Sequence, residues 1–417
     1  MQSVSIKCVF WIFVAASCGH RDIPPGSLGS GMTTKPKAST APTIDGGVPA
    51  CVHAMRPCPP PCPDNSPNVN AFPVNGLAIN GKGECSPESV QVMPGSLHSP
   101  NPKCKGDFDL TVDTNKTKLV GKNDSGTCDG QNLKGATFSV RGDTVVEFQI
   151  TDVKPSLQLD DGKPGPEGYR IIRTGGSVSL CDVDTANAVR AELGITTIPK
   201  YEVAGVTGTG DANHDYVAVI PGPIYAEDIS VADKTGQFYN LACADDALAK
   251  RSFDGLYNQG SADSDDYNIA ALRMMTATYC GKHYTVHGMT FHWKERIMNV
   301  SNHPEARWLP GEVSCLETPR LTTLKKKGIQ PKDLPDELLP DGCKPASDDK
   351  ASSKTRPHSS CSWDRWVTEV QKECVGAGSG SAFKTCKSQD YDYESFPGDT
   401  DSTYRKKKKD DHGSPSP

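Results

Sequence analysis

The sequence predicts a mainly β fold of the α+β class: an antiparallel β domain with one or two packed helices, stapled by disulfides and flanked by disordered linkers. Short runs of β-branched and aromatic residues follow one another between residues 107 and 241, separated by Gly, Asp, Asn and Pro. The chain also has 16 cysteines, together with 39 Gly and 33 Pro, more than an average chain of 417 residues carries. Disulfides and long connecting segments are therefore expected around the β domain.

The predicted strands are short and bounded by turn residues. They cover residues 107–112, 137–140, 144–153, 169–174, 177–181, 216–220 and 237–241. Two helices are predicted in the same region, over residues 185–193 and 266–279. The second carries Ile269, Leu272, Met275 and Tyr279 at helical spacing. We expect the β domain to span residues 105–322.

The N-terminus predicts export. Residues 8–16 form an apolar stretch that fits a signal peptide over residues 1–17 and is too short to span a membrane. The stretch ends in Ala15-Ala16-Ser17-Cys18-Gly19, which resembles a bacterial lipoprotein cleavage box with Cys18 as the lipidated residue. The alternative is ordinary cleavage and secretion, with Cys18 a free or paired thiol. The expected location is the outer membrane or cell surface, and otherwise the periplasm or the exterior.

The cysteine count agrees with export. Removing Cys8 with the signal peptide and Cys18 with the lipid leaves 14 of the 16 cysteines, an even number that predicts disulfides outside the cytosol. Structural zinc is the competing interpretation. Cys58 and Cys62 have a tolerable spacing for two ligands, but no second Cys or His pair follows at finger spacing.

The remaining segments are predicted from composition. Residues 18–50 are expected to be a disordered tether, and residues 51–104 a Pro- and Cys-rich segment with little core of its own. After the β domain we expect a linker over residues 323–360. A small Cys-containing helical segment follows over residues 361–389, with its helix at 363–375, and a disordered charged tail over residues 390–417 ends the chain.

A series of short motifs resembles one protein family. Leu272 to Gly281, with Ala277, Thr278, Tyr279 and Cys280 at its end, resembles the signature of the ADYC-domain family, exported bacterial proteins named for an Ala-Asp-Tyr-Cys motif. Other pieces occur in the family's order. They are Leu133-Lys134-Gly135-Ala136-Thr137-Phe138, Val219-Ile220-Pro221-Gly222, Leu241-Ala242-Cys243, Ala247-Leu248-Ala249-Lys250, Pro304-Glu305-Ala306-Arg307-Trp308 and Val313-Ser314-Cys315.

The resemblance implies an exported, lipoprotein-like protein and no particular chemistry. Two residues depart from the pattern: Thr278 stands where the family has Asp, and Arg251 where a Cys usually follows. The first departure replaces the family's acidic side chain, and the second replaces a cysteine of one family disulfide. The disulfide candidates are Cys181, Cys243, Cys280 and Cys315, with their connectivity left open.

One pair of histidines is a candidate metal site. Val286 and Met289 flank His287-Gly288, the pattern of a tight β-hairpin. Continued outward, that hairpin places His283 opposite His292, and facing positions about 5 Å apart at Cβ can share a metal. Glu295 or His303 would be the third ligand. The alternative is a chance pair of histidines, and we assign no cofactor.

The composition and motifs favour a role without catalysis. The net charge of -6 gives no basic surface for nucleic acid, and neither Gly-x-Ser-x-Gly nor His-Glu-x-x-His occurs. We assign no catalytic residue. The prediction is a non-enzymatic binding or structural protein that meets the membrane through a lipid on Cys18 and binds an extracellular ligand or protein. The alternatives are an exported metal-assisted hydrolase and a carbohydrate-binding module that uses Trp293, Trp308, Trp363 and Trp366.

Overall fold

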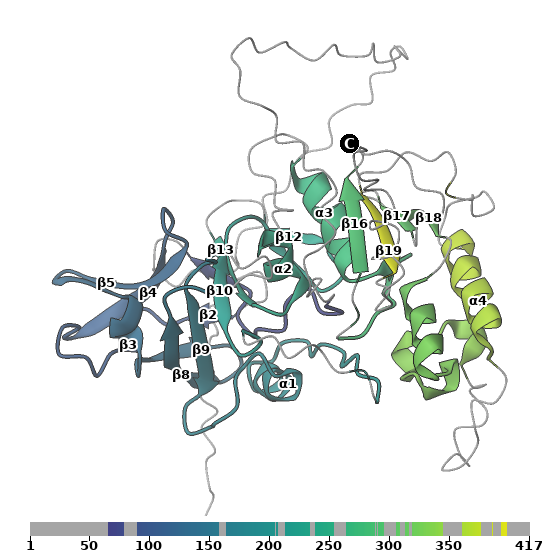
Figure 1. Ribbon diagram of the computed structural model, residues 1–417. Coiled ribbons are helices and arrows are strands. Elements are labelled where there is room, and N and C mark those ends of the chain that lie inside the picture. The colour runs from purple at the N-terminus through teal and green to yellow at the C-terminus, as the bar shows by residue number, and fades with distance from the viewer. Residues whose placement is uncertain are drawn as a thin grey trace, which may run out of the picture. The chain divides into compact units, whose positions relative to one another are not determined.

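The computed structural model (Figure 1) describes most of the chain between residues 66 and 397. The described residues are 66–78, 90–157, 164–204, 206, 213–233, 238–253, 264–287, 289, 291–295, 306–308, 313–316, 319–344, 361–376, 386 and 393–397. They all belong to one unit, residues 54–417. The strands in this unit pair antiparallel, and helices pack among them, so the predicted fold class is confirmed.

The largest sheet has the strand order β1-β13-β10-β9-β8-β7-β3-β4-β5-β6, and β2 also pairs with β7. Its strands are β1 (Gly76–Ala78), β2 (Gln91–Val92), β3 (Leu97–His98), β4 (Asp107–Asp113), β5 (Lys118–Asn123), β6 (Gly126–Asp129), β7 (Thr137–Arg141), β8 (Val145–Lys154), β9 (Gly168–Arg173), β10 (Val217–Ile220) and β13 (Phe238–Cys243). The other pairs are β11 (Ile224–Tyr225) with β12 (Val231–Asp233) and β14 (Thr278–Tyr279) with β15 (Lys282–His283). A second sheet has the order β16-β19-β17-β18, with bounds Phe291–Glu295, Tyr393–Pro397, Ala306–Trp308 and Val313–Leu316.

The α-helices are α1 (Val183–Glu192), α2 (Ala247–Phe253), α3 (Ser264–Met275) and α4 (Trp363–Gly376). The 3-10 helices are η1 (Gly130–Leu133), η2 (Arg320–Lys327), η3 (Pro331–Asp333), η4 (Asp336–Leu338) and η5 (Asp341–Cys343). Helix α1 begins where the Asp182 carboxylate accepts a hydrogen bond from the Thr185 backbone N–H at 2.8 Å, an ordinary N-cap.

Strands β10 and β13 separate two hydrophobic clusters. Successive side chains of a strand point to opposite faces, so Val217 and Val219 join one cluster while Ala218 and Ile220 join the other. The first cluster is built mainly on strands β4 to β9, and the second contains α2, α3, α4 and the 3-10 helices η2 and η4. This double burial explains why the run Val-Ala-Val-Ile shows no alternation with polar residues.

One predicted strand and two predicted segment boundaries are wrong. Residues 177–181 form no strand, because only Ser179 makes an isolated bridge to Ile172. The linker predicted from residue 323 begins too early, since residues up to 344 include 3-10 helices that bury Leu324, Leu338 and Leu339. The tail predicted from residue 390 contains β19, which is hydrogen-bonded between β16 and β17 and so completes the second sheet.

Five disulfides link the described cysteines, and all of them close loops between segments distant in sequence. They are Cys104–Cys128, Cys181–Cys243, Cys280–Cys374, Cys315–Cys386 and Cys343–Cys361. Thiols in the cytosol are kept reduced, so these bonds indicate folding in an oxidising compartment. In the parts of the chain that the structure describes, no helix combines the length and apolar character needed to cross a membrane.

Candidate functional site

The Ala-Thr-Tyr-Cys motif forms the end of α3 and a tight hairpin. Ala277 has a φ of 45° just after the helix, the left-handed conformation that commonly ends helices. Cys280 and Gly281 join β14 to β15 with φ values of 56° and 85°, and positive φ at both central residues is what a two-residue type I′ turn requires. The left-handed turn residue Cys280 is tied by its disulfide to Cys374 of α4. The motif therefore fixes a turn in the backbone.

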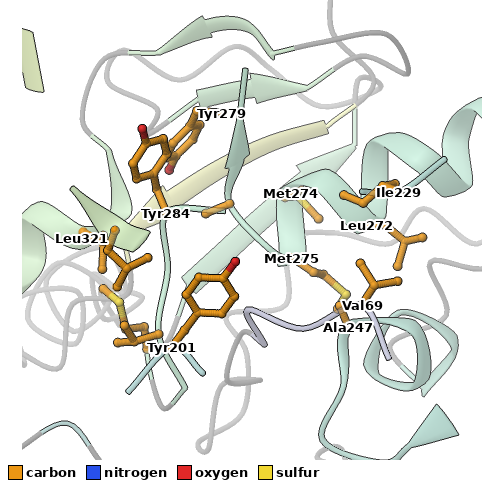
Figure 2. Close-up of a cluster of buried hydrophobic side chains, with 14 of the residues drawn as sticks. Val69, Tyr201, Ile229, Ala247, Leu272, Met274, Met275, Tyr279, Tyr284 and Leu321 are labelled. Carbon is orange, nitrogen blue, oxygen red and sulfur yellow. The ribbon is translucent and has the colours of Figure 1, made fainter. Parts of the chain in front are cut away.

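Tyr279 of the motif lies in the core. Its ring stacks on Trp308 at 5.3 Å and on Tyr284 at 5.9 Å between centroids, and Figure 2 shows the two tyrosine rings side by side. The Tyr279 hydroxyl accepts a hydrogen bond from the Arg320 backbone N–H at 3.1 Å. The fully buried Arg320 guanidinium donates to the carbonyls of Met274 and Met275, at 2.7 and 3.1 Å. Arg320 thus satisfies carbonyls that the end of α3 leaves without helical partners.

Thr278, where the family has Asp, is also buried. Its hydroxyl lies 2.6 Å from the Thr276 hydroxyl, which in turn bonds the Leu272 carbonyl at 2.8 Å. Two hydroxyls can each act as donor and acceptor, so this pair satisfies itself without a charge. None of the motif side chains faces a described cavity, and their common role is to position the hairpin against α3 and α4.

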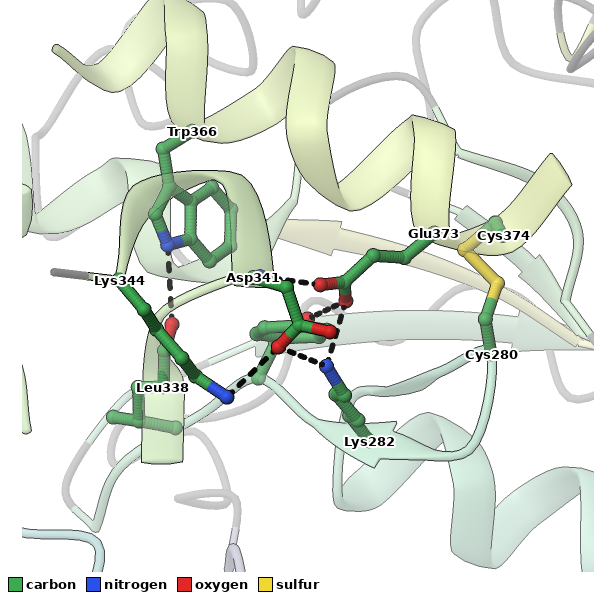
Figure 3. Close-up of polar contacts among 9 residues, drawn as sticks. Cys280, Lys282, Leu338, Asp341, Lys344, Trp366, Glu373 and Cys374 are labelled. Atoms are coloured by element: carbon green, nitrogen blue, oxygen red, sulfur yellow. Dashed lines mark hydrogen bonds and ion pairs between the residues drawn. A yellow bond between two sulfur atoms is a disulfide. The ribbon is translucent and has the colours of Figure 1, made fainter. Parts of the chain in front are cut away.

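A polar cluster joins the hairpin to α4 and η5 (Figure 3). The Glu373 carboxylate accepts hydrogen bonds from the Tyr284 hydroxyl at 2.6 Å, from Lys282 Nζ at 3.1 Å and from the Asp341 backbone N–H at 2.5 Å. Burial, followed by the bond to Glu373, raises the pKa of Tyr284. Lys282 and Lys344 also pair with the exposed Asp341 carboxylate, holding its pKa below the ordinary value. These contacts fasten α4 beside the disulfide Cys280–Cys374.

The most unusual feature is a buried segment upstream of the β domain, residues 66–78, which we call the strap. Every residue from 66 to 77 is buried, although Pro, Asn and Ser make up much of the sequence. Val69 packs with Ala247, Leu272 and Met275 in the cluster of Figure 2, while Phe72, Val74 and Leu77 enter the other cluster. Its end is β1, which pairs with β13 at the edge of the large sheet.

Ionisable side chains bind the backbone of the strap. Glu227 accepts from the Val69 N–H at 3.1 Å, Asp246 accepts from the Ala71 N–H at 2.6 Å, and His283 Nδ1 lies 2.5 Å from the Pro67 carbonyl oxygen. The first N–H groups of α2 complete the set: Ala247 and Leu248 donate to the carbonyls of Asn68 and Val69 at 3.1 and 3.2 Å. The first N–H groups of a helix have no carbonyl partner within the helix and can bind other acceptors. Several polar backbone groups of the strap are thereby satisfied by distant side chains and by α2.

The environment shifts the pKa values of these groups. Burial raises the pKa of Asp246 to about 7 and that of Glu227 to about 8, against the opposing effect of the strap's N–H groups. Burial also lowers the pKa of His283, whose ring stacks on Tyr201. Neighbouring Asp245 behaves differently. Burial by itself would raise the pKa of Asp245, but Lys250, 2.5 Å away, and His287 outweigh that effect and lower it. Perturbed pKa values often mark functional sites, and here they mark the strap.

The strap contacts predict how stability depends on pH. Between about pH 4 and pH 7 to 8, folded Asp246 and Glu227 keep protons that the unfolded chain has released, so the free energy of unfolding should fall as the pH rises through this range. Each unit of pKa difference corresponds to about 1.4 kcal/mol, so each of the two carboxyl groups contributes a fall on the order of a few kcal/mol. The lowered pKa of His283 has the opposite effect. Below its ordinary pKa the unfolded chain takes up a proton that the folded chain does not, so this group raises the free energy of unfolding as the pH rises. Two carboxyl groups act against one histidine, so the net expectation is a fall in the free energy of unfolding as the pH rises from about 4 to 8.

Urea unfolding at a series of pH values from 4 to 9 measures this profile. The matched variant is Asp246→Asn, which keeps an oxygen acceptor for the Ala71 N–H and cannot ionise. We expect the parent to lose stability as the pH rises from 4 to 8, and the variant to lose less. Equal slopes in the two proteins would show that Asp246 does not carry the dependence.

The structure does not form the predicted histidine hairpin. His283 is opposite Thr278, and His292 is opposite Phe396 in the second sheet, so the predicted pairing of His283 with His292 is wrong. The physical reason is that β15 ends at His283 and the chain then continues into a different sheet. The side chains of His292 and Glu295 and all of His303 lie outside what the structure describes. Among the described residues, no three His, Cys, Asp or Glu side chains are grouped to hold a metal ion.

The described tryptophans of the predicted sugar-stacking face lie in the core. Trp308, Trp363 and Trp366 are buried, and their indole N–H groups donate to Ser395 Oγ and to the carbonyls of Ile329 and Leu338 at 2.9 to 3.1 Å. Buried indoles commonly find such partners. These three rings are therefore unable to stack on an external sugar, and the side chain of Trp293 is outside the described residues.

The four candidate cysteines all form disulfides. Cys181 bonds with Cys243 inside the β domain, whereas Cys280 and Cys315 bond with Cys374 and Cys386 near the C-terminus. Cys18 lies outside the described residues. Sequence reasoning missed the strap and its partners Glu227 and Asp246. The signals available were the absence of charge in the strap and the Asp-Asp pair that precedes α2.

Comparison with known protein families agrees with the motif. The profile of the ADYC domain matches residues 130–322. That part of the chain therefore belongs to the ADYC-domain family. No curated protein and no solved structure matches the chain. The matched part is completed from both sides, because strands β1 to β6 precede it and β19 and α4 follow it.

Proposed function

We propose that this chain is an exported, lipid-anchored cell-surface protein with a non-enzymatic binding or structural role. The observation that carries the proposal is the set of five disulfides, which suits an oxidising compartment and locks segments from residue 104 to residue 386 together. An apolar leader that ends in a small-residue box before Cys18 supplies a route of export and a point of attachment.

The arrangement of the ionisable groups supports a role in binding. Asp246, Glu227 and His283 have the shifted pKa values expected of catalytic groups, yet each is bonded to the chain's own backbone. The motif residues likewise serve core packing, a left-handed turn and a disulfide. The geometry thus favours a rigid, stapled scaffold that presents or binds a polypeptide over one that transforms a substrate.

Radiolabelled palmitate and membrane fractionation test the anchor in a bacterial host. We expect the parent chain to take up label and sediment with membranes, and Cys18→Ala to lose both properties. The matched control is Cys8→Ala, because Cys8 lies inside the leader and is removed with it. Label that persists in Cys18→Ala, or that is absent from the parent, would remove the lipid anchor from the proposal.

A further inference from the structure

The strap is bound to the β domain in the way that a separate peptide would be. It contains no cysteine and no charged residue, so neither a disulfide nor an ion pair holds it. The C-terminal segment, by contrast, is fastened by Cys280–Cys374 and Cys315–Cys386. The contacts of the strap are main-chain hydrogen bonds, buried apolar side chains and side-chain amides, such as Asn70 Nδ2, which donates to the Leu241 carbonyl at 2.7 Å.

These contacts define a groove with two kinds of binding element. Glu227, Asp246 and the N-terminus of α2 bind the backbone of residues 68–71. Further along, β1 adds to the edge of the large sheet through the register Gly76↔Asn240, Leu77↔Tyr239 and Ala78↔Phe238. Addition of an extended segment to a sheet edge, with apolar side chains entering pockets, is a general mode of peptide recognition.

The groove also places limits on its occupant. Asp246 and Glu227 bind backbone N–H groups of a fully buried segment, so a charged side chain in that segment would lose its water without gaining a partner. Val69 and Phe72 are fully buried in the two hydrophobic clusters, so their places require apolar side chains of similar size. A second copy of the chain offers an uncharged segment that meets both requirements, because it is identical.

We propose that the strap exchanges between copies: residues 66–78 of one chain can occupy the groove of a second chain and link the two. Eleven residues, 79–89, connect the strap to the next described residue and can reach roughly 36 Å when extended. Exchange of an identical element is a low-cost route to association, since every contact made within one copy is reproduced between two. The inference deepens the binding role proposed above. It rests on that proposed function in one respect: anchoring of many copies to one surface raises their effective concentration.

Two versions of the full chain with different C-terminal tags test the exchange. They are purified separately, mixed and incubated until the strap amides have exchanged with deuterated solvent, as followed by mass spectrometry. One tag is then used for capture. We expect the other version to be captured with it, and excess synthetic peptide of residues 66–78 to reduce that capture more than tenfold. A peptide with the same residues in scrambled order is the control and should have no effect.

Each contrary result overturns the proposal. If the strap amides exchange and no mixed species forms, the groove does not accept a second copy. If the amides never exchange, the strap is a fixed part of one chain. If a mixed species forms and is insensitive to the peptide, the copies associate through another surface. The assay uses purified chain, so none of these outcomes bears on export or on the lipid at Cys18.

Discussion

Removing the disulfide Cys280–Cys374 should lower the free energy of unfolding by about 4 kcal/mol. The bond closes a loop with a sequence separation of 94 residues, and a longer loop costs the unfolded chain more entropy when it is closed. It also fixes the turn of the motif hairpin against α4. The variant is the double replacement of Cys280 and Cys374 by alanine, which leaves no thiol to form a wrong bond.

The matched control removes Cys104–Cys128, which has a sequence separation of 24 residues, in the same way. Its loss should cost about 3 kcal/mol, because the loop it closes is shorter. Urea unfolding of the parent and of both variants gives the comparison. A larger loss from Cys104–Cys128 would contradict the view that the long-range bond is the more important of the two.

Replacing Trp308 by alanine should cost about 3 to 5 kcal/mol, the usual range for a large aromatic side chain in a core. The ring is fully buried and stacks on Tyr279 of the motif, and its indole N–H bonds Ser395 Oγ at 2.9 Å. The substitution leaves a cavity between the motif and the second sheet, and it leaves the buried Ser395 hydroxyl without this donor.

Trp308→Phe is the matched control. It keeps an aromatic ring against Tyr279 and loses the bond to Ser395, so its loss should lie well below that of Trp308→Ala. Thermal and urea unfolding measure both. A loss below about 1 kcal/mol in Trp308→Ala would show that the motif does not depend on this packing.

Elements with a strong local pattern could be predicted from the sequence. Strand β10 is a run of apolar residues, α1 has a capping Asp182, and α4 lies within one residue of its predicted end. Strand β6 was missed because it is polar and lies at the sheet edge, and β5 was missed because its apolar run is only Leu119-Val120. The 3-10 helices after residue 320 bury leucines that are not regularly spaced in the sequence. A segment without hydrophobic periodicity is predicted to be a linker.

The candidate site was harder to predict than the fold. The resemblance located Ala277 to Cys280, but their role depends on Trp308, Arg320 and Cys374, which are distant in sequence. The contacts of the strap were harder still to predict from the sequence, because its partners bind backbone groups that every sequence has. Glu227 and Val69, for example, are separated by 158 positions and share no pattern. The histidine hairpin failed for the same reason, since β19 supplies the partner of β16 from about 100 positions away.

The central claim is that the buried ionisable groups bind the strap backbone, and hydrogen exchange of the strap amides tests it most directly. In the parent chain we expect the amides of Val69 and Ala71 to be protected, since they donate to Glu227 and Asp246. Asp246→Asn should keep the protection of Ala71, because an amide oxygen still accepts, and Asp246→Leu should lose it. Strap amides that exchange in the parent as fast as those of an unfolded peptide would contradict the account.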